Sequence, residues 1–494
     1  MASNSIGSDF VYGMPWDEID TVLALGPGMG AMTALLAERG KTLVALESLP
    51  KAGAALPYAP ATFDLITLNG MFEPRFLAEA IRLLKPGGYL YAARGARFAL
   101  EGLRYKKMLV RAGFGSVDVF GVLDRYDRQK AVYRLGDSSP RRFTRNLVSP
   151  PATWKGGLLR RVSGVLEDGV VVFGRKTRKD GRLAWPGLPH DGPVAQFSSS
   201  DKVFVLCFDG EPSSVFKGPK TTQAAALLTK EYEFLRAASR RHGAESESWP
   251  LRWPKPLGEQ EHHGRPLYRY EFARGSLLSN QLLRLSFSLP RFSRLFAGLV
   301  DGYVELCARM SAAPSGSEGR SVDALLDRLA VAAIGDSAAS ERIKAACEKW
   351  RRKKSPPSFT HGDLSLSNTM LLPDGRMVLI DWENASTEGI VAIDLLRLLN
   401  DTLDESRLLK PKSGRAVMER ARMIVREALG RIGVGPEDYE DVEALFVAHQ
   451  FDMWLSRDAG AATSLRARNL LRSYRDREFA LDVSPARGKP GSAG

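Results

Sequence analysis

The chain has 494 residues, of which 44% are apolar and 26% charged, as in soluble globular proteins, and its length predicts two or three domains. It contains no uninterrupted run of about 18 apolar residues, no signal-peptide pattern and no paired-cysteine motif. These absences exclude a disulfide or zinc framework and predict a cytoplasmic protein in which Cys207, Cys307 and Cys347 are buried thiols. The net charge of +13 favours contact with anionic partners.

The first patterned segment is an apolar run at residues 21–25 that leads into Gly26, Gly28 and Gly30. A helical pattern follows, and then a second strand over residues 42–46 that ends at Glu47. Glycines let the backbone approach a ligand, and an acidic residue after the second strand can bind ribose hydroxyls. The order predicts the first half of a nucleotide-binding α/β unit.

Two later segments, FDLI at 63–66 and LLKPGGYL at 83–90, extend this pattern. Residues 16–176 together resemble class I S-adenosylmethionine-dependent methyltransferases. The resemblance implies a Rossmann-like α/β domain in which Gly26, Gly28, Gly30 and Glu47 bind S-adenosylmethionine. Ala24 stands where the family usually has an acidic residue, and the interval after Glu47 is too short for the helix and strand that reach the adenine. A working methyltransferase and a trimmed remnant kept for packing or recognition are both open.

A basic segment follows, in which cations far outnumber acids: Arg141, Arg142, Arg145, Lys155, Arg160, Arg161, Arg175, Lys176, Arg178, Lys179 and Arg182. Such a segment attracts polyanions or an anionic membrane surface, and the alternative is a solvated face. We expect no nucleic-acid binding, because no base-reading motif accompanies the charge. Residues 177–200 are rich in Arg, Lys, Gly, Pro and Ser and predict a linker.

Beyond the linker, strands are predicted over residues 202–208 and 214–217, joined by a turn. A helix is predicted over residues 224–238, and a further strand over 265–273. Lys217 ends the second strand, and Glu231 lies in the helix with Glu233 as an alternative in nearly the same position.

The most informative motif is HGDLSLSN at residues 361–368, followed by IDWE at 380–383 after a short hairpin. Phosphoryl transfer needs a carboxylate that takes or orients the proton of a hydroxyl, and oxygen ligands that hold Mg²⁺ against phosphates. Asp363, Asn368 and Asp381 supply these groups. The alternative is an Asp-rich solvated turn.

This spacing resembles the aminoglycoside phosphotransferase and choline kinase branch of the protein-kinase-like fold. The resemblance implies ATP and Mg²⁺, with Asp363 as the base and Asn368 and Asp381 as metal ligands. It makes Lys217 the lysine that holds the α/β-phosphates and Glu231 its helix partner, while His361 braces the loop.

Asp394 opens a helical segment, where the resemblance implies support of the catalytic loop and local chemistry allows an N-cap. Helical patterns over residues 416–432, 439–457 and 463–480 would wall the acceptor pocket. The predicted domains are a trimmed methyltransferase-like domain at 1–176, a linker at 177–200, an α+β bilobal kinase at 201–275 and 276–484, and a disordered tail at 485–494.

The domain order resembles methyltransferase–kinase enzymes of bacterial surface polysaccharide synthesis. It implies phosphorylation of a hydroxyl on a small molecule or glycan, with peripheral contact at the inner face of the membrane. The alternatives are an antibiotic or metabolite kinase with a relic methyltransferase domain, and a non-catalytic nucleotide-binding scaffold.

Overall fold

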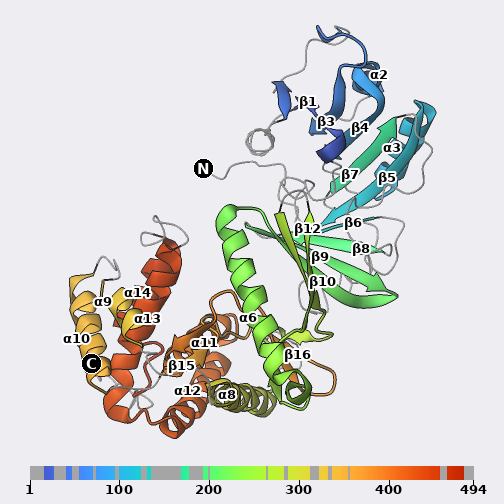
Figure 1. The fold of residues 1–494 in the computed structure, drawn as a ribbon. Coiled ribbons are helices and arrows are strands. Elements are labelled where there is room, and N and C mark those ends of the chain that lie inside the picture. Colours follow the sequence, from blue (N-terminus) through green and yellow to red (C-terminus); the bar gives the residue numbers. More distant parts are fainter. Residues whose placement is uncertain are drawn as a thin grey trace, which may run out of the picture. The chain divides into compact units, whose positions relative to one another are not determined.

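The structure is a computed structural model that describes residues 16–26, 41–46, 55–69, 74–94, 99–123, 131–134, 169–176, 193–198, 201–262, 265–282, 288–311, 322–331, 336–353, 357–456 and 464–482. The chain divides into two compact units. The first comprises Met1–Leu228 and Leu257–Phe272, and the second Thr229–Pro256 and Ala273–Gly494. Figure 1 shows the helices and strands of both units, coloured along the sequence.

The first unit is built on a twelve-stranded sheet of order β12-β13-β10-β9-β8-β6-β5-β7-β4-β3-β1-β2. Its strands are β1 (Thr21–Leu25), β2 (Thr42–Leu46), β3 (Phe63–Asn69), β4 (Leu84–Arg94), β5 (Phe114–Leu123), β6 (Ala131–Arg134), β7 (Gly169–Lys176), β8 (Val194–Ser198), β9 (Lys202–Asp209), β10 (Glu211–Pro219), β12 (Pro256–His262) and β13 (Arg265–Glu271). Its helices are the 3₁₀ turn η2 (Trp16–Glu18), α2 (Pro74–Leu83) and α3 (Ala99–Arg111).

The N-terminal part of this sheet is parallel: β1 pairs with β2 and β3, and β3 pairs with β4. β7 then runs antiparallel between β4 and β5. Leu23, Ile66 and Leu90 are fully buried in one apolar cluster, and burial of each such side chain contributes roughly 1.5–3 kcal/mol. The strands at 21–25 and 42–46 therefore form as predicted, in the parallel arrangement of an α/β unit.

The FDLI and LLKPGG segments meet at Asp64, which joins two neighbouring strands. Its Oδ2 accepts hydrogen bonds from the backbone N–H of Thr21 (2.9 Å) and from Thr21 Oγ1 (2.7 Å), and Lys85 Nζ lies 2.8 Å from Oδ1. A Cβ on Gly88 would lie 3.0 Å from the Asp64 carbonyl oxygen, and Gly87 has φ +80°. These residues shape the first part of β4, which follows α2 directly.

The pairs β5–β6, β6–β8, β8–β9, β9–β10 and β10–β13 are antiparallel. The predicted strands at 202–208 and 214–217 lie within β9 and β10. β8 lies inside the segment predicted as a linker, where it pairs with β9 on one side and β6 on the other. Val194 is buried in an apolar cluster with Val205, Cys207 and Phe216. Part of the predicted linker is thus a strand of the sheet.

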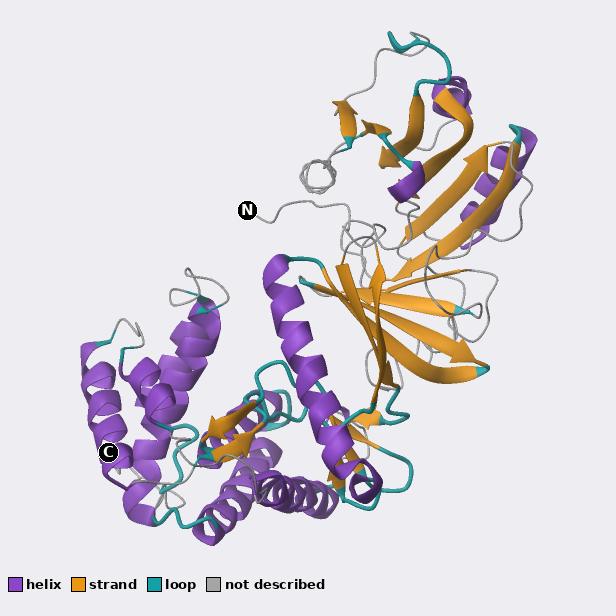
Figure 2. Cartoon of the chain, in the orientation of Figure 1, coloured by secondary structure: helices purple, strands orange, loops and turns teal. Residues whose placement is uncertain are grey.

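The second unit is mainly helical (Figures 1 and 2). Its helices are α6 (Thr222–Ser246, whose first residues belong to the first unit), α7 (Ser279–Leu282), α8 (Leu289–Ser311), α9 (Asp323–Ala330), α10 (Ser337–Lys353), α11 (Val391–Ser406), α12 (Pro411–Arg431), η4 (Pro436–Asp438), α13 (Tyr439–Leu455) and α14 (Leu465–Arg475). Its short strands are β11 (Leu251–Arg252), β14 (Ser276–Leu277), β15 (Ser358–Thr360), β16 (Thr369–Leu371), β17 (Met377–Leu379) and β18 (Ser386–Gly389).

The predicted C-terminal helices are present as α12, α13 and α14, and α14 ends earlier than the pattern indicates because the chain turns at Arg477, which has φ +53°. All three cysteines are free and buried, as predicted. Among the described residues no helix is long and apolar enough to cross a membrane. Most of the basic segment and the predicted disordered tail lie outside the described residues.

Candidate active site

The HGD motif lies in a loop between β15 and β16, and its shape depends on Gly362. This residue has φ +81°, and a Cβ there would collide with the backbone carbonyl of Asn384. The positive φ and the close approach both require glycine. The loop is therefore held against the segment that follows Asp381.

Asp394, in the first turn of α11, anchors the loop from behind. Its Oδ2 accepts the backbone N–H of His361 at 2.8 Å, and the N–H of Gly362 lies 3.1 Å from both carboxylate oxygens. The hydroxyl of Tyr303 on α8 donates to the same carboxylate. The N-cap of α11 is Ile390, so the N-cap alternative for Asp394 is wrong and its support of the loop is the observed role.

His361 is fully buried, and both of its ring nitrogens are engaged. Nε2 lies 3.0 Å from the carbonyl oxygen of Ile380, which can only accept, so Nε2 carries the proton and Nδ1 accepts the backbone N–H of Asp363 at 3.2 Å. The ring also packs edge-on against Trp382, with centroids 4.6 Å apart. The neutral imidazole is thus a brace between the loop and the strand before Asp381.

Asp363 is held by two partners. Its Oδ1 accepts a hydrogen bond from Arg397 Nε at 2.8 Å, and Asn368 Nδ2 donates to its Oδ2 at 3.2 Å and to its carbonyl oxygen at 3.0 Å. Burial raises the pKa of Asp363, but the charge and hydrogen bond of the Arg397 guanidinium outweigh burial and keep the pKa below its usual value. The carboxylate is therefore ionised at neutral pH and fixed in orientation.

Asp381 follows β17 with φ +68°, a conformation that non-glycine residues rarely adopt and that Asp tolerates better than most. The N–H of Ile380 donates to the carbonyl oxygen of Asn368 at 2.8 Å, which joins the two motifs. The negative charge of Asp381 raises the pKa of Asp363, as expected for neighbouring carboxylates. The carboxylate of Asp381 and the amide oxygen of Asn368 are hard oxygen donors of the kind that suits Mg²⁺.

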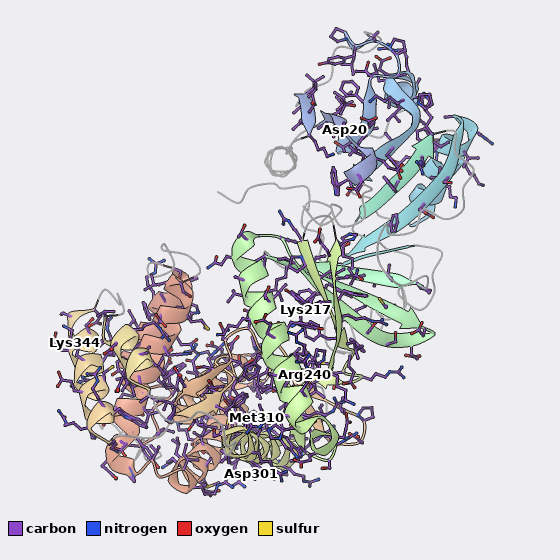
Figure 3. All side chains as sticks on the ribbon, in the orientation of Figure 1. Asp20, Lys217, Arg240, Asp301, Met310 and Lys344 are labelled. Carbon is purple, nitrogen blue, oxygen red and sulfur yellow. The ribbon has the colours of Figure 1, made fainter. Side chains whose placement is uncertain are left out.

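Lys217 belongs to the first unit and Glu231 to the second. Lys217 lies on β10 (Figure 3), is 8% exposed, and its Nζ is 5.3 Å from the centroid of the Tyr270 ring. Glu231 on α6 is fully buried, whereas Glu233 is exposed. This difference favours Glu231 over Glu233, and its pairing with Lys217 stays a prediction.

Of the residues predicted to bind S-adenosylmethionine, the structure describes only Gly26. It has φ +113° and donates its N–H to the carbonyl oxygen of Leu46 at 3.0 Å, which joins the ends of β1 and β2. Gly28, Gly30 and Glu47 lie outside the described residues.

Sequence reasoning missed Arg397 and Tyr303 as parts of the site. Arg397 is 7% exposed on α11, in a run where the neighbouring Leu395, Leu396, Leu398 and Leu399 are all fully buried. A cation inside such an apolar run needs a buried anion, and this was the available signal. Nothing in the sequence indicated the role of Tyr303, because a Tyr within a helical apolar pattern usually belongs to the hydrophobic core.

Residues 194–415 match the model of the phosphotransferase enzyme family. The matched segment begins at the first residue of β8, ends within α12, and contains Lys217, Glu231 and the whole HGD loop. The match supports a protein-kinase-like phosphotransferase fold for this part of the chain, which is less than half of its length. No curated protein matches the chain.

Several solved structures are similar at low identity. An amicoumacin kinase in complex with AMP-PNP, Ca²⁺ and its ligand is 12% identical over 58% of this chain and 87% of its own, with a TM-score of 0.37. An aminoglycoside phosphotransferase from Streptomyces rimosus is 17% identical over 51% and 92%, with a TM-score of 0.33. A SAM-dependent methyltransferase from Archaeoglobus fulgidus is 12% identical over 34% and 91%, with a TM-score of 0.23. At these scores the similarity alone supports no conclusion about either unit.

Proposed function

We propose that the chain is an ATP-dependent phosphotransferase that moves the γ-phosphoryl group of ATP to a hydroxyl of a small molecule or glycan. The observation that carries the proposal is the connected set of Asp363, Asn368 and Asp381 within the segment that matches the phosphotransferase family. The hydrogen bonds that fix this set come from buried groups of His361 and Asp394, so the loop is organised before any substrate binds.

In this proposal Asp363 accepts or orients the proton of the acceptor hydroxyl as its oxygen attacks the γ-phosphorus. The Arg397 guanidinium keeps the carboxylate ionised and aimed, which suits positioning more than strong basicity. Asn368 and Asp381 would hold Mg²⁺, which when bound neutralises the charge that builds on the phosphate oxygens. Lys217 would hold the α/β-phosphates, with Glu231 as its partner.

For residues 16–176 we propose a methyltransferase-like domain, supported by the parallel order β2-β1-β3-β4. A role of the whole chain in surface polysaccharide or secondary metabolite synthesis rests on the order of the domains alone. A metabolite kinase with a relic first domain is the competing proposal. The two differ in whether the chain transfers a methyl group at all.

The test is ATP turnover by the full chain with Mg²⁺ against a panel of sugars, aminoglycosides, choline and lipid-linked glycan. An acceptor should stimulate turnover, and Asp363→Ala should reduce the stimulated rate by at least about 100-fold while ATP still binds. Asp374→Ala is the matched control, because Asp374 lies in an exposed turn where its carboxylate bonds only the nearby Arg376. Equal rates in the Asp363 variant and the parent would contradict the assignment of the base.

A further inference from the structure

A cavity of about 370 Å³ lies within the second unit, beside the loop that carries Asp363. It is bounded by α6, α9, β15, β18, the start of α11 and α13, and its volume is in the range of small-molecule sites. Thr360 in its wall directly precedes His361, and Asn384 closely follows Asp381. The cavity therefore adjoins both catalytic motifs, yet neither Asp363 nor Asp381 forms its wall.

Hydrogen-bond donors from separate elements line this cavity. Lys230 comes from α6, Arg328 from α9 and His449 from α13, and they are joined by the hydroxyls of Thr360 and Ser386. The two cations are close enough that Arg328, after burial, lowers the pKa of Lys230, although Glu383 opposes the shift. Like charges that converge on one space are stabilised when an anion occupies it.

These cations are not committed elsewhere in the fold. Lys230 is exposed to solvent, and the charge of Glu383 does not outweigh burial and Arg328, so the pKa of Lys230 is lowered. Arg328 forms one ion pair, between its Nε and Asp452 Oδ2 at 3.4 Å, and its Nη1 also donates to the carbonyl oxygen of Ala324 at 3.4 Å. The Arg328 side chain is 59% exposed. An exposed pair of this kind contributes about 1 kcal/mol at most, so it leaves the guanidinium able to bind a ligand.

His449 adds a donor of a different kind. Its Nδ1 is buried and has no hydrogen-bond partner among the described residues. Burial lowers the pKa of His449, with Asp394 opposing and Arg328 assisting, so the ring is neutral at pH 7 and keeps one N–H. A buried ring nitrogen without a partner costs free energy unless a ligand or water fills the role.

Two acidic residues, Asp394 and Glu388, also line the cavity, but they do not make it a cation site. The carboxylate of Asp394 already accepts hydrogen bonds from Tyr303, His361 and Gly362. Glu388 on β18 is exposed to solvent. The groups that remain to meet a ligand are the donors.

We infer that this cavity binds a phosphate or carboxylate group of a small molecule. The group could belong to the phosphoryl acceptor, in which case the inference rests on the proposed function, or to a separate anionic effector. Guanidinium, ammonium and imidazole donors from three helices surround an oxyanion better than a cation such as an aminoglycoside. The anion site itself stands whether or not the chain is a kinase.

The first test is calorimetric titration of the full chain with inorganic phosphate. The parent should bind phosphate, and Lys230→Gln and Arg328→Gln should each weaken binding at least tenfold, because each removes a charge-assisted hydrogen bond to the anion. Both residues are exposed enough to be replaced without unfolding the chain. Arg328→Lys should restore part of the affinity. Lys344→Gln is the matched control: Lys344 lies on α10 (Figure 3), is 54% exposed and pairs only locally with Glu341.

Lys217→Gln separates this site from the predicted nucleotide site. It should leave phosphate binding unchanged if phosphate occupies the cavity. Loss of binding in Lys217→Gln but not in Lys230→Gln would overturn the inference, and so would a parent that binds no phosphate at about 10 mM. None of these results depends on turnover, so they are distinct from failure of the proposed function.

Kinetics then identify the source of the anion. Acceptors are compared in pairs, a free sugar and its phosphate, with inorganic phosphate as inhibitor. Preference for the phosphorylated member, with competitive inhibition by phosphate, assigns the group to the acceptor. An effect of phosphate on rate that leaves the KM of the acceptor unchanged assigns it to a separate effector.

Discussion

Among single residues, Arg397 is the one whose replacement we expect to change both activity and stability. It is the buried cation that faces Asp363, and Asp401 and Asp404 also interact with its charge. Arg397→Met should lower the rate of phosphoryl transfer at least tenfold and destabilise the fold by about 1–3 kcal/mol, because it leaves the partly buried carboxylate of Asp363 without its cation. The measurements are acceptor-stimulated turnover and the midpoint of chemical unfolding.

A double variant separates the two causes. Asp363→Asn in the Arg397→Met background removes the uncompensated charge and should recover part of the lost stability, while turnover stays low. If Arg397→Met unfolds at the same denaturant concentration as the parent, the ion pair is not a stabilising element.

At this scale the meeting of the motif residues in one place could be predicted and their supports could not, while their chemical roles stay predictions. Asp363, Asn368 and Asp381 are separated by short, fixed distances along the chain, so a linear motif contains them. Their supports, Tyr303 and Arg397, lie on the helices α8 and α11. The residues next to them in the sequence do not identify which distant residue each of them contacts. Asp394 was identified only as one of two alternatives, which its contact with the loop decides.

Among the helices and strands, too, those set by local sequence could be predicted and those set by distant partners could not. Strands such as β9 and helices such as α12 form where the local pattern predicts them, because β9 is a nearly continuous buried apolar run and α12 buries apolar residues at helical spacing. β8 was missed because it is short and embedded in a segment rich in Gly, Pro and Arg. It is a strand because β9 and β6 pair with it, which is a long-range cause.

The contact between α13 and the C-terminal segment predicts a pH-dependent stability. Glu443 on α13 is 3% exposed, its Oε1 accepts the N–H of Leu481 at 2.8 Å, and burial raises its pKa to about 7. The folded state therefore holds this proton more tightly than the unfolded state, whose carboxyl has a pKa of 4.5. The unfolding free energy should fall as pH rises from 4.5 to about 7, by up to about 3 kcal/mol.

Glu443→Gln isolates this contribution, because the amide keeps an acceptor for Leu481 and does not ionise. Urea unfolding at pH 8 should show the variant to be more stable than the parent, and the difference should vanish near pH 4.5. Parallel stability profiles for the two proteins would show that the Glu443 carboxyl ionises in the folded state as freely as in water.

For the whole molecule, the sequence predicts two functional segments, whereas the contacts divide the chain differently. The first unit contains the methyltransferase-like strands and also β9, β10 and β13, which were predicted for the kinase. One sheet that runs through both groups explains this. Composition could reveal where one segment changes into the next. It could not reveal that β8, inside the predicted linker, would pair with β6 of the first segment and β9 of the second.

This continuity makes the start of the phosphotransferase segment testable. The family match begins at residue 194 and the predicted domain at 201, and the two differ by β8. Val194 is 7% exposed and Ala195 is fully buried, so the loss of these residues exposes Val205, Leu206 and Phe208 of β9.

Two truncated chains test this boundary. The chain of residues 193–482 should melt at a higher temperature than the chain of residues 201–482, because each buried side chain that is lost costs about 1.5–3 kcal/mol. The longer chain ends its sheet in a short strand, whereas the shorter one leaves the long strand β9 as an unprotected edge and should also aggregate more readily. Equal melting temperatures and equal solubility would place the boundary at 201 and reduce β8 to a link between independent parts.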